Sequence, residues 1–311
     1  MIFLEKFRDG RYGINFSSDQ EDNIVIKLID GYTGLTVYQD RMTVLPGIIF
    51  FCSHDGRGSQ RIYEIWSSDT KNLLLRVSAM VHDGISIESL DRYGHLKNFK
   101  YNNNEDNDPG LPLYEIFLDK IYEKNFRVEE GDTVVDIGGN IGIFSYYSIC
   151  RGAKKVYCFE PSPQQCSTIR ENFKFDNLQI EEAAVSGSEG TISFFINPTS
   201  SINSSILPAN GSTEVKCKSV NLENYLDSVG EDKIDYLKID CEGGEYEIFE
   251  SLSLDFLKHK VEKMCVEYHY NSGRKIMPIL EKLDSAGFNV EFERDPSQID
   301  DDLGIFYAWK K

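Results

Sequence analysis

The sequence lacks any long uninterrupted apolar run. No stretch approaches the roughly 18 apolar residues of a membrane-spanning helix, and the apolar run that follows Met1 is too short for a secretion signal. The seven cysteines include no Cys-x-x-Cys pair, and several lie within apolar runs, where a thiol packs as a small apolar side chain. We therefore expect reduced cysteines and a cytoplasmic protein without a membrane partner.

The chain also has fewer basic than acidic side chains. The chain has 33 Lys and Arg against 51 Asp and Glu, which gives a net charge of −18. Because nucleic acids and anionic membranes select basic surfaces, this balance argues against both as partners. The acidity would suit a cationic cofactor or a neutral polar substrate, and general solubility explains it equally well. A length of 311 residues predicts two domains.

The first ninety residues carry short apolar segments separated by turn residues. The predicted strands cover residues 23–30, 35–39, 47–52, 61–66 and 73–81. Their spacing predicts a small all-β, sandwich-like domain over residues 1–100. This region holds no catalytic constellation, so we expect a binding, docking or homo-oligomerisation module. The polar stretch 101–111 predicts a linker, and residues 112–311 a second domain.

Residues 133–145 organise the second domain. A β-branched apolar run breaks at Gly138 and Gly139 and resumes as a helix after Gly142, which predicts a strand, a tight turn and a helix. Glycines let a ligand approach the backbone, and the helix N-terminus offers it N–H groups. A dinucleotide fingerprint would require glycine where Asn140 stands, and the Gly-Lys-Ser/Thr of a P-loop is missing.

Two carboxylates flank this turn in the predicted sheet. Asp136 ends the first strand, and the strand 155–159 runs into Glu160 and Pro161, 24 residues after Asp136. An acid at about this distance from the glycine turn is placed to accept hydrogen bonds from ribose hydroxyls. The alternative is that both acids are structural. We favour a site for a ribose-containing cofactor.

Strands and helices alternate through the rest of the chain. Strands are predicted at 178–185, 191–196, 263–269, 289–293 and 305–309, and another begins at residue 234 and ends in the acids near residue 240. Helices are predicted at 162–175, 220–228 and 274–286, with a long loop at 198–213. This order predicts an α/β, doubly wound, Rossmann-like sheet.

Four motifs together resemble the FkbM family of S-adenosylmethionine-dependent methyltransferases. They are Asp-Ile-Gly-Gly-Asn-Ile-Gly at 136–142, Phe-Glu-Pro at 159–161, Leu-Lys-Ile-Asp-Cys-Glu-Gly-Gly-Glu at 237–245 and Val-Glu-Tyr-His at 266–269. The resemblance covers roughly residues 112–310 and leaves out the N-terminal domain. It implies a seven-stranded methyltransferase sheet that binds S-adenosylmethionine. It also implies O-methylation of a hydroxyl on a sugar, a glycan or a glycosylated metabolite.

Methyl transfer to a hydroxyl requires in-line geometry and a base that takes the hydroxyl proton. Asp240, Glu242, Glu267 and His269 follow strands whose carboxyl ends meet at one sheet edge, so they are the catalytic candidates. His269 is the best base by intrinsic pKa, and Asp240 by position; a purely structural His269 is the alternative. Converging carboxylates would also suit a divalent metal ion that lowers the pKa of the hydroxyl.

Two other functions stay open. A small-molecule N-methyltransferase would need no strong base. A non-catalytic assembly protein could keep the cofactor fold without its chemistry. The presence of Asp136, Glu160 and Asp240 together favours an enzyme.

Overall fold

The computed structural model describes most of the chain, with gaps in the N-terminal region and in three later segments. The described residues are 2–6, 12–16, 22–30, 36–44, 49–52, 60–67, 70–71, 73–80, 91–101, 110–196, 212–269, 275–293 and 303–311. The chain forms two compact units: Met1–Phe99 with Asp108–Lys120 make up unit 1, and Lys100–Asn107 with Ile121–Lys311 make up unit 2. Most of the predicted linker lies outside the described residues, so the predicted domain bounds stay a prediction.

Unit 1 contains two antiparallel sheets, with strand orders β4-β3-β6-β7 and β1-β2-β5. The strands are β1 (Ile2–Lys6), β2 (Tyr12–Phe16), β3 (Asp22–Asp30), β4 (Thr36–Val44), β5 (Ile49–Cys52), β6 (Gln60–Ser67) and β7 (Leu73–Met80). Strands β3 to β7 overlap the five predicted segments, whereas β1 and β2 lie outside them. A short helix α2 (Gly110–Leu113) and a π-helical turn (Tyr114–Asp119) also belong to unit 1. The sandwich arrangement stays a prediction.

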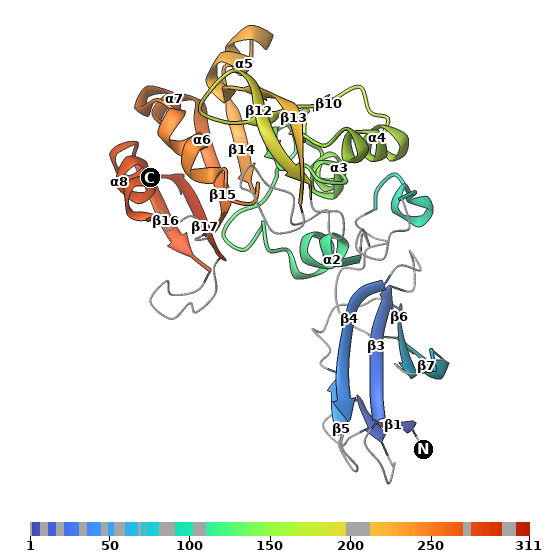
Figure 1. Cartoon of the computed structure of the whole chain (residues 1–311). Coiled ribbons are helices and arrows are strands. Elements are labelled where there is room, and N and C mark those ends of the chain that lie inside the picture. Colours follow the sequence, from blue (N-terminus) through green and yellow to red (C-terminus); the bar gives the residue numbers. More distant parts are fainter. Residues whose placement is uncertain are drawn as a thin grey trace. The chain divides into compact units, whose positions relative to one another are not determined.

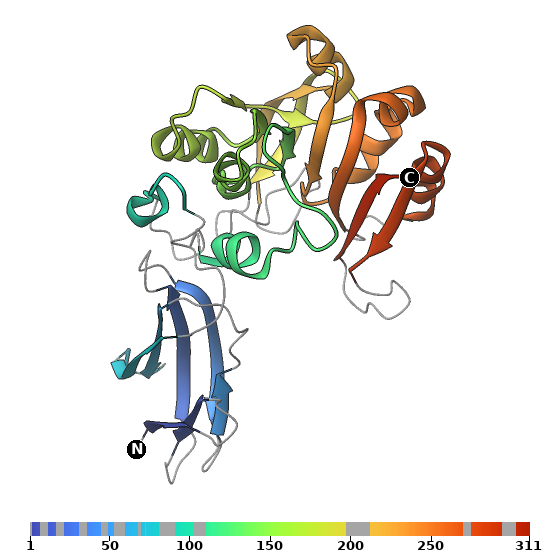
Figure 2. The same ribbon diagram turned by 180° about the vertical axis from the view of Figure 1, so that it is seen from behind.

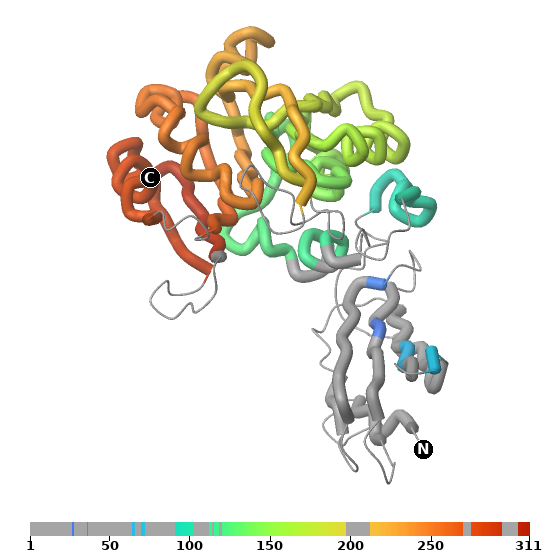
Figure 3. The backbone as a smooth tube through the Cα atoms, in the orientation of Figure 1, coloured from blue at the N-terminus to red at the C-terminus, as the bar shows by residue number. Residues whose placement is uncertain are grey.

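Unit 2 is built on a seven-stranded sheet of order β10-β9-β8-β14-β15-β17-β16. Strands β10, β14, β15, β16 and β17 are labelled in Figure 1. Its strands are β8 (Thr133–Ile137), β9 (Lys155–Phe159), β10 (Leu178–Glu181), β14 (Ile234–Ile239), β15 (Val261–His269), β16 (Phe288–Phe292) and β17 (Leu303–Lys310). Strand β17 runs antiparallel to both its neighbours, and the other pairs are parallel. Figure 3 follows this chain from green at β8 to red at β17. The predicted Rossmann-like, seven-stranded α/β sheet is confirmed.

Helices cover both faces of this sheet (Figure 1 and Figure 2). They are α3 (Ile143–Cys150), α4 (Pro163–Asn172), α5 (Leu222–Val229), α6 (Glu245–Ser251), α7 (Leu254–Lys260) and α8 (Met277–Ser285). Because strand side chains alternate between faces, Val135 and Leu237 pack into one apolar cluster with residues of α5 to α8. On the opposite face, the ring centroids of Tyr236 and of Phe144 in α3 lie 5.6 Å apart. The parallel strands are therefore buried on both sides.

The predicted strand 178–185 is wrong as one element. Strand β10 stops at Glu181, and β11 (Ala184–Val185) pairs with β13 (Thr213–Val220), which in turn pairs with β12 (Gly190–Ile196). The N–H of Ala183 donates to the carbonyl oxygen of Glu181 at 2.9 Å, so the chain turns there and leaves the main sheet. Most of the predicted loop 198–213 lies outside the described residues.

The predicted helix 220–228 begins too early. Val220 belongs to β13, and the side chain of Asn221 accepts a hydrogen bond from the N–H of Asn224 at 3.1 Å. This N-cap starts α5 at Leu222.

Candidate active site

The glycine turn follows β8 and is shaped by its neighbours. Gly138 and Gly142 have φ values of +80° and +83°, which favour glycine. A Cβ at Gly138 would lie 1.7 Å from the carbonyl oxygen of Asp240, and one at Gly139 would lie 2.2 Å from the Sγ of Cys158. The first two glycines therefore let the turn pack against the ends of β14 and β9, a reason that the sequence did not disclose.

Glu160 joins this turn to the end of β9. Its Oε2 accepts a hydrogen bond from the N–H of Asn140 at 2.8 Å, and its Oε1 accepts one from the N–H of Ser162 at 2.8 Å. Burial raises the pKa of Glu160 to about 7, although both hydrogen bonds oppose the rise. Pro161 is half-buried between Glu160 and the N-cap Ser162 of α4.

The side chain of Asn140 offers an unused acceptor at the same place. Its Oδ1 is buried and has no hydrogen-bond partner among the described residues. A buried acceptor of this kind calls for a donor from a ligand or water. Together with the Glu160 carboxylate, it fits a cofactor that carries hydroxyl and amino donors, as S-adenosylmethionine does.

Asp136 is fully buried at the end of β8, and its role in cofactor binding stays a prediction. Its Oδ2 accepts a hydrogen bond from the Ser145 hydroxyl at 2.7 Å, and its Oδ1 lies 3.3 Å from the Nζ of Lys238. Burial raises the pKa of this carboxyl above its ordinary value, while Lys238 opposes the rise. Asp136 is therefore tied to Lys238 and, through Ser145, to α3.

Lys238 is the functional residue that sequence reasoning passed over. Its Nζ donates to the carbonyl oxygen of Gly138 at 2.8 Å and lies 3.3 Å from the carboxylates of both Asp136 and Asp240. The ring of Tyr122 lies 5.4 Å from the same ammonium group. Burial alone would lower the pKa of Lys238, but the two carboxylates raise it above its ordinary value. The available signal was a lysine inside a buried apolar strand.

Asp240 follows β14 directly and belongs to this Lys238 network. Its Oδ2 accepts a hydrogen bond from the Tyr122 hydroxyl at 2.9 Å, in addition to the ion pair with Lys238. The side chain is 24% exposed, so it can still be reached from outside. Asp240 is thus held by two donors on one oxygen.

The other three catalytic candidates meet around His269. Its Nε2 lies 3.3 Å from Glu242 and 3.7 Å from Glu267, and its Nδ1 lies 3.2 Å from the Oε1 of Glu245. Burial would lower the pKa of His269, but Glu245, Glu242 and Asp240 raise it to about 9. Burial raises the pKa of Glu242 to about 7. His269 is therefore doubly protonated and positively charged at neutral pH. Glu245 also belongs to this cluster, although it was not among the catalytic candidates predicted from the sequence.

Within the described ranges, no group of three or more His, Cys, Asp or Glu side chains is arranged to hold a metal ion. The divalent metal ion stays a prediction. In the same part of the chain, no helix has both the length and the apolar character needed to cross a membrane.

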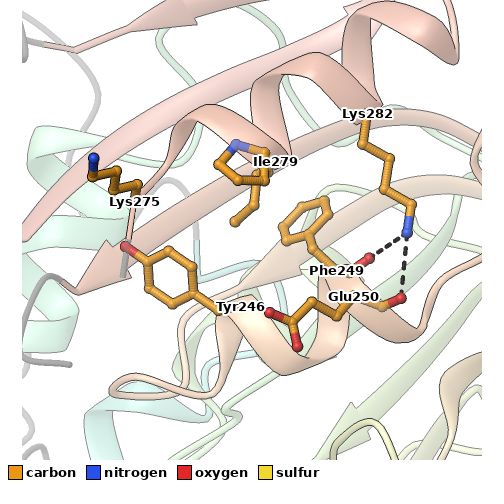
Figure 4. A pocket seen from close by; sticks show the side chains of 7 residues that line it. Tyr246, Phe249, Glu250, Lys275, Ile279 and Lys282 are labelled. Atoms are coloured by element: carbon orange, nitrogen blue, oxygen red, sulfur yellow. Dashed lines mark hydrogen bonds between the residues drawn. The ribbon is translucent and has the colours of Figure 1, made fainter. Parts of the chain in front are cut away.

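A pocket lies between α6 and α8, with a volume of about 390 Å³ (Figure 4). Tyr246, Phe249 and Ile279 form its apolar wall. Lys282 stands at its rim and donates to the carbonyl oxygens of Phe249 at 2.6 Å and Glu250 at 3.4 Å. Neither the glycine turn nor the His269 cluster lines it.

The strand order with an antiparallel β17 and the acid after β9 agree with the seven-stranded methyltransferase sheet that the sequence motifs imply. Residues 136–290 match the methyltransferase FkbM domain. The chain therefore carries a domain of the FkbM family of S-adenosylmethionine-dependent methyltransferases.

Among solved structures, the chain is similar to methyltransferases at low sequence identity and low TM-score. A precorrin-6y C5,15-methyltransferase from Geobacter metallireducens is 16% identical, with 68% of this chain and 95% of that chain covered and a TM-score of 0.39. An rRNA methylase from Streptococcus thermophilus is 12% identical, with 59% and 89% covered and a TM-score of 0.35. No curated protein matches the chain in sequence.

Proposed function

We propose that this protein transfers the methyl group of S-adenosylmethionine to a hydroxyl of a sugar, a glycan or a glycosylated metabolite. One observation carries the proposal: carboxylates follow β14 directly, and the carbonyl oxygen of Asp240 packs against Gly138 of the glycine turn. An acceptor hydroxyl beside the cofactor would thus lie next to groups that can take its proton. Amine acceptors need no such groups.

The cofactor would be held by the glycine turn, Asn140 and Glu160. S-adenosylmethionine supplies an electrophilic methyl group, whose bond to sulfur breaks with the electron pair left on sulfur. The acceptor oxygen forms the new bond to carbon, and its proton passes to a carboxylate of this chain. The role of the chain is to align the acceptor and to place the base.

The test uses S-adenosylmethionine with a ¹³C-labelled methyl group and a panel of sugars, each paired with its amino-sugar analogue. Mass spectrometry and ¹³C NMR identify the methylated atom. We expect an O-methyl product, with the rate reduced at least tenfold in Asp240→Asn and unchanged in Glu247→Gln, which alters a partly exposed acid of α6. An N-methyl product that persists in the double variant Asp240→Asn, His269→Ala would support a small-molecule N-methyltransferase instead.

For unit 1 we propose a role in substrate holding, docking or homo-oligomerisation. The net charge of −18 supports partners other than nucleic acid or anionic membranes. Light scattering on the full chain would test the oligomer. A non-catalytic assembly protein would form the oligomer but bind no cofactor.

A further inference from the structure

The buried carboxylate of Glu245 holds two parts of the site at once. It is fully buried at the first residue of α6, and its Oε1 accepts hydrogen bonds from the N–H groups of Cys241 at 3.2 Å and Gly243 at 3.1 Å. The same oxygen lies 3.2 Å from the Nδ1 of His269. Its Oε2 has no hydrogen-bond partner among the described residues. One oxygen thus serves both the loop after β14 and the end of β15.

This contact decides which atoms of His269 carry hydrogen. Because Oε1 already accepts two backbone hydrogen bonds, it acts as an acceptor toward the imidazole, so the Nδ1 of His269 carries a hydrogen. The Nε2 faces the carboxylates of Glu242 and Glu267 and donates toward them. His269 is therefore a donor to Glu242 and not a base at neutral pH, in keeping with its pKa of about 9.

The backbone of Glu242 is held in an unusual conformation. Its φ of +56° lies in the left-handed region, which costs a residue with a side chain about 1–2 kcal/mol. The residues on either side, Cys241 and Gly243, are the ones whose N–H groups donate to Glu245. A glutamate where glycine or asparagine would be favoured indicates that its side chain serves the site.

We propose that Glu245 is a positioning residue that aims the carboxylate of Glu242 as the proton acceptor for methyl transfer. It acts through His269 and through the backbone on both sides of Glu242. In the step, the acceptor hydroxyl loses its proton to Glu242 while its oxygen bonds to the methyl carbon, and the carbon–sulfur electron pair stays on sulfur. The neutral Glu242 then releases the proton to water. This inference rests on the proposed function.

Two comparisons favour Glu242 over the other candidates. Asp240 already accepts a hydrogen bond from Tyr122 and pairs with Lys238 on the same oxygen, which leaves that oxygen less free to accept a hydrogen bond from the acceptor hydroxyl. Glu242 has a pKa of about 7, close to the value that suits a base at neutral pH.

The first experiment follows the imidazole of His269 by ¹⁵N NMR titration of the full chain, with His269→Asn used to assign the signal. Glu242, Glu245, Glu267 and Asp240 are the charged groups that face this ring. We expect a pKa near 9 in the wild type and in Glu247→Gln, and a fall of one unit or more in Glu245→Gln. An unchanged titration in Glu245→Gln would overturn the contact on which the proposal depends.

The second experiment measures kcat and KM as a function of pH, with a substrate whose hydroxyl group is methylated. Glu242→Gln is expected to lower kcat about a hundredfold or more, and Glu245→Gln about tenfold, with KM and S-adenosylhomocysteine affinity within threefold of wild type. His269→Gln, which keeps a donor without the charge, should behave like Glu245→Gln and serves if that variant fails to fold. Full activity in Glu242→Gln would overturn the proposal. If the wild type methylates no hydroxyl, both the proposed function and the role of Glu242 as the base are refuted. The NMR result decides separately whether Glu245 holds His269.

Discussion

The ammonium group of Lys238 donates a hydrogen bond to the carbonyl oxygen of Gly138 at 2.8 Å. This bond ties the carboxyl end of β14 to the first residue of the glycine turn. The same ammonium group pairs with both Asp136 and Asp240, so the position of the turn and the charge of the site depend on one side chain.

Replacement of Lys238 by methionine removes this cation and leaves Asp136 buried without it. We expect the free energy of unfolding to fall by about 3–5 kcal/mol, because an uncompensated buried charge remains. Urea denaturation of the purified variant measures the change. The matched control is Lys263→Met on β15, whose ion pair with Asp132 at 2.9 Å is partly exposed; we expect a loss of about 1 kcal/mol there. Equal losses in the two variants would contradict a central role for Lys238.

Gly138→Ala tests the packing of the glycine turn. The added Cβ would lie 1.7 Å from the backbone oxygen of Asp240, at a φ of +80°. We expect a loss of about 4 kcal/mol or more, because rigid backbone must move. Gly230→Ala is the control, with a φ of +70° and no described atom within 4 Å of the new Cβ, and should cost only about 1–2 kcal/mol. Thermal unfolding compares the two, and similar costs would show that backbone strain alone matters.

The affinity for S-adenosylhomocysteine should rise with pH. A carboxyl whose pKa is raised keeps its proton to higher pH. Because the pKa of Glu160 is about 7, the fraction of Glu160 that is ionised increases between pH 6 and pH 8. If that form accepts the ribose hydroxyls, the association constant increases about tenfold between pH 6 and pH 8. Calorimetry at both pH values measures the association constant. We expect Glu160→Gln to bind S-adenosylhomocysteine weakly and with little dependence on pH. A flat wild-type profile would show that the ionised form is not required.

The α/β sheet could be predicted from local patterns. Apolar runs of strand length that end in glycine or acid mark β8, β9 and β14, and their alternation with helices gives the sheet. Strand β13 was missed although residues 213–220 alternate apolar and polar side chains. Helix α7 was missed although Ser253 caps it by accepting from the N–H of Phe256 at 3.0 Å. Both signals are present in the sequence. The alternation in β13 directly follows the serine-rich loop, and α7 is too short to give a clear helical pattern.

The contacts of the site could not be predicted in the same way. The sequence places acids after β14 and β15, but the contact between Glu245 and His269 joins residues 24 positions apart. The hydrogen bond from Tyr122 to Asp240 spans 118 positions. Such pairs depend on how the strands align in space. The left-handed conformation of Glu242 is likewise set by its neighbours and not by its own preference.

The most direct test of the account is calorimetric titration of the full chain with S-adenosylhomocysteine, beside Glu160→Ala and with NAD as the control ligand. We predict micromolar binding to the wild type, weakened at least tenfold in Glu160→Ala, or by about 1.4 kcal/mol, and none of NAD. A folded wild-type protein that binds no S-adenosylhomocysteine would contradict the methyltransferase assignment of this site.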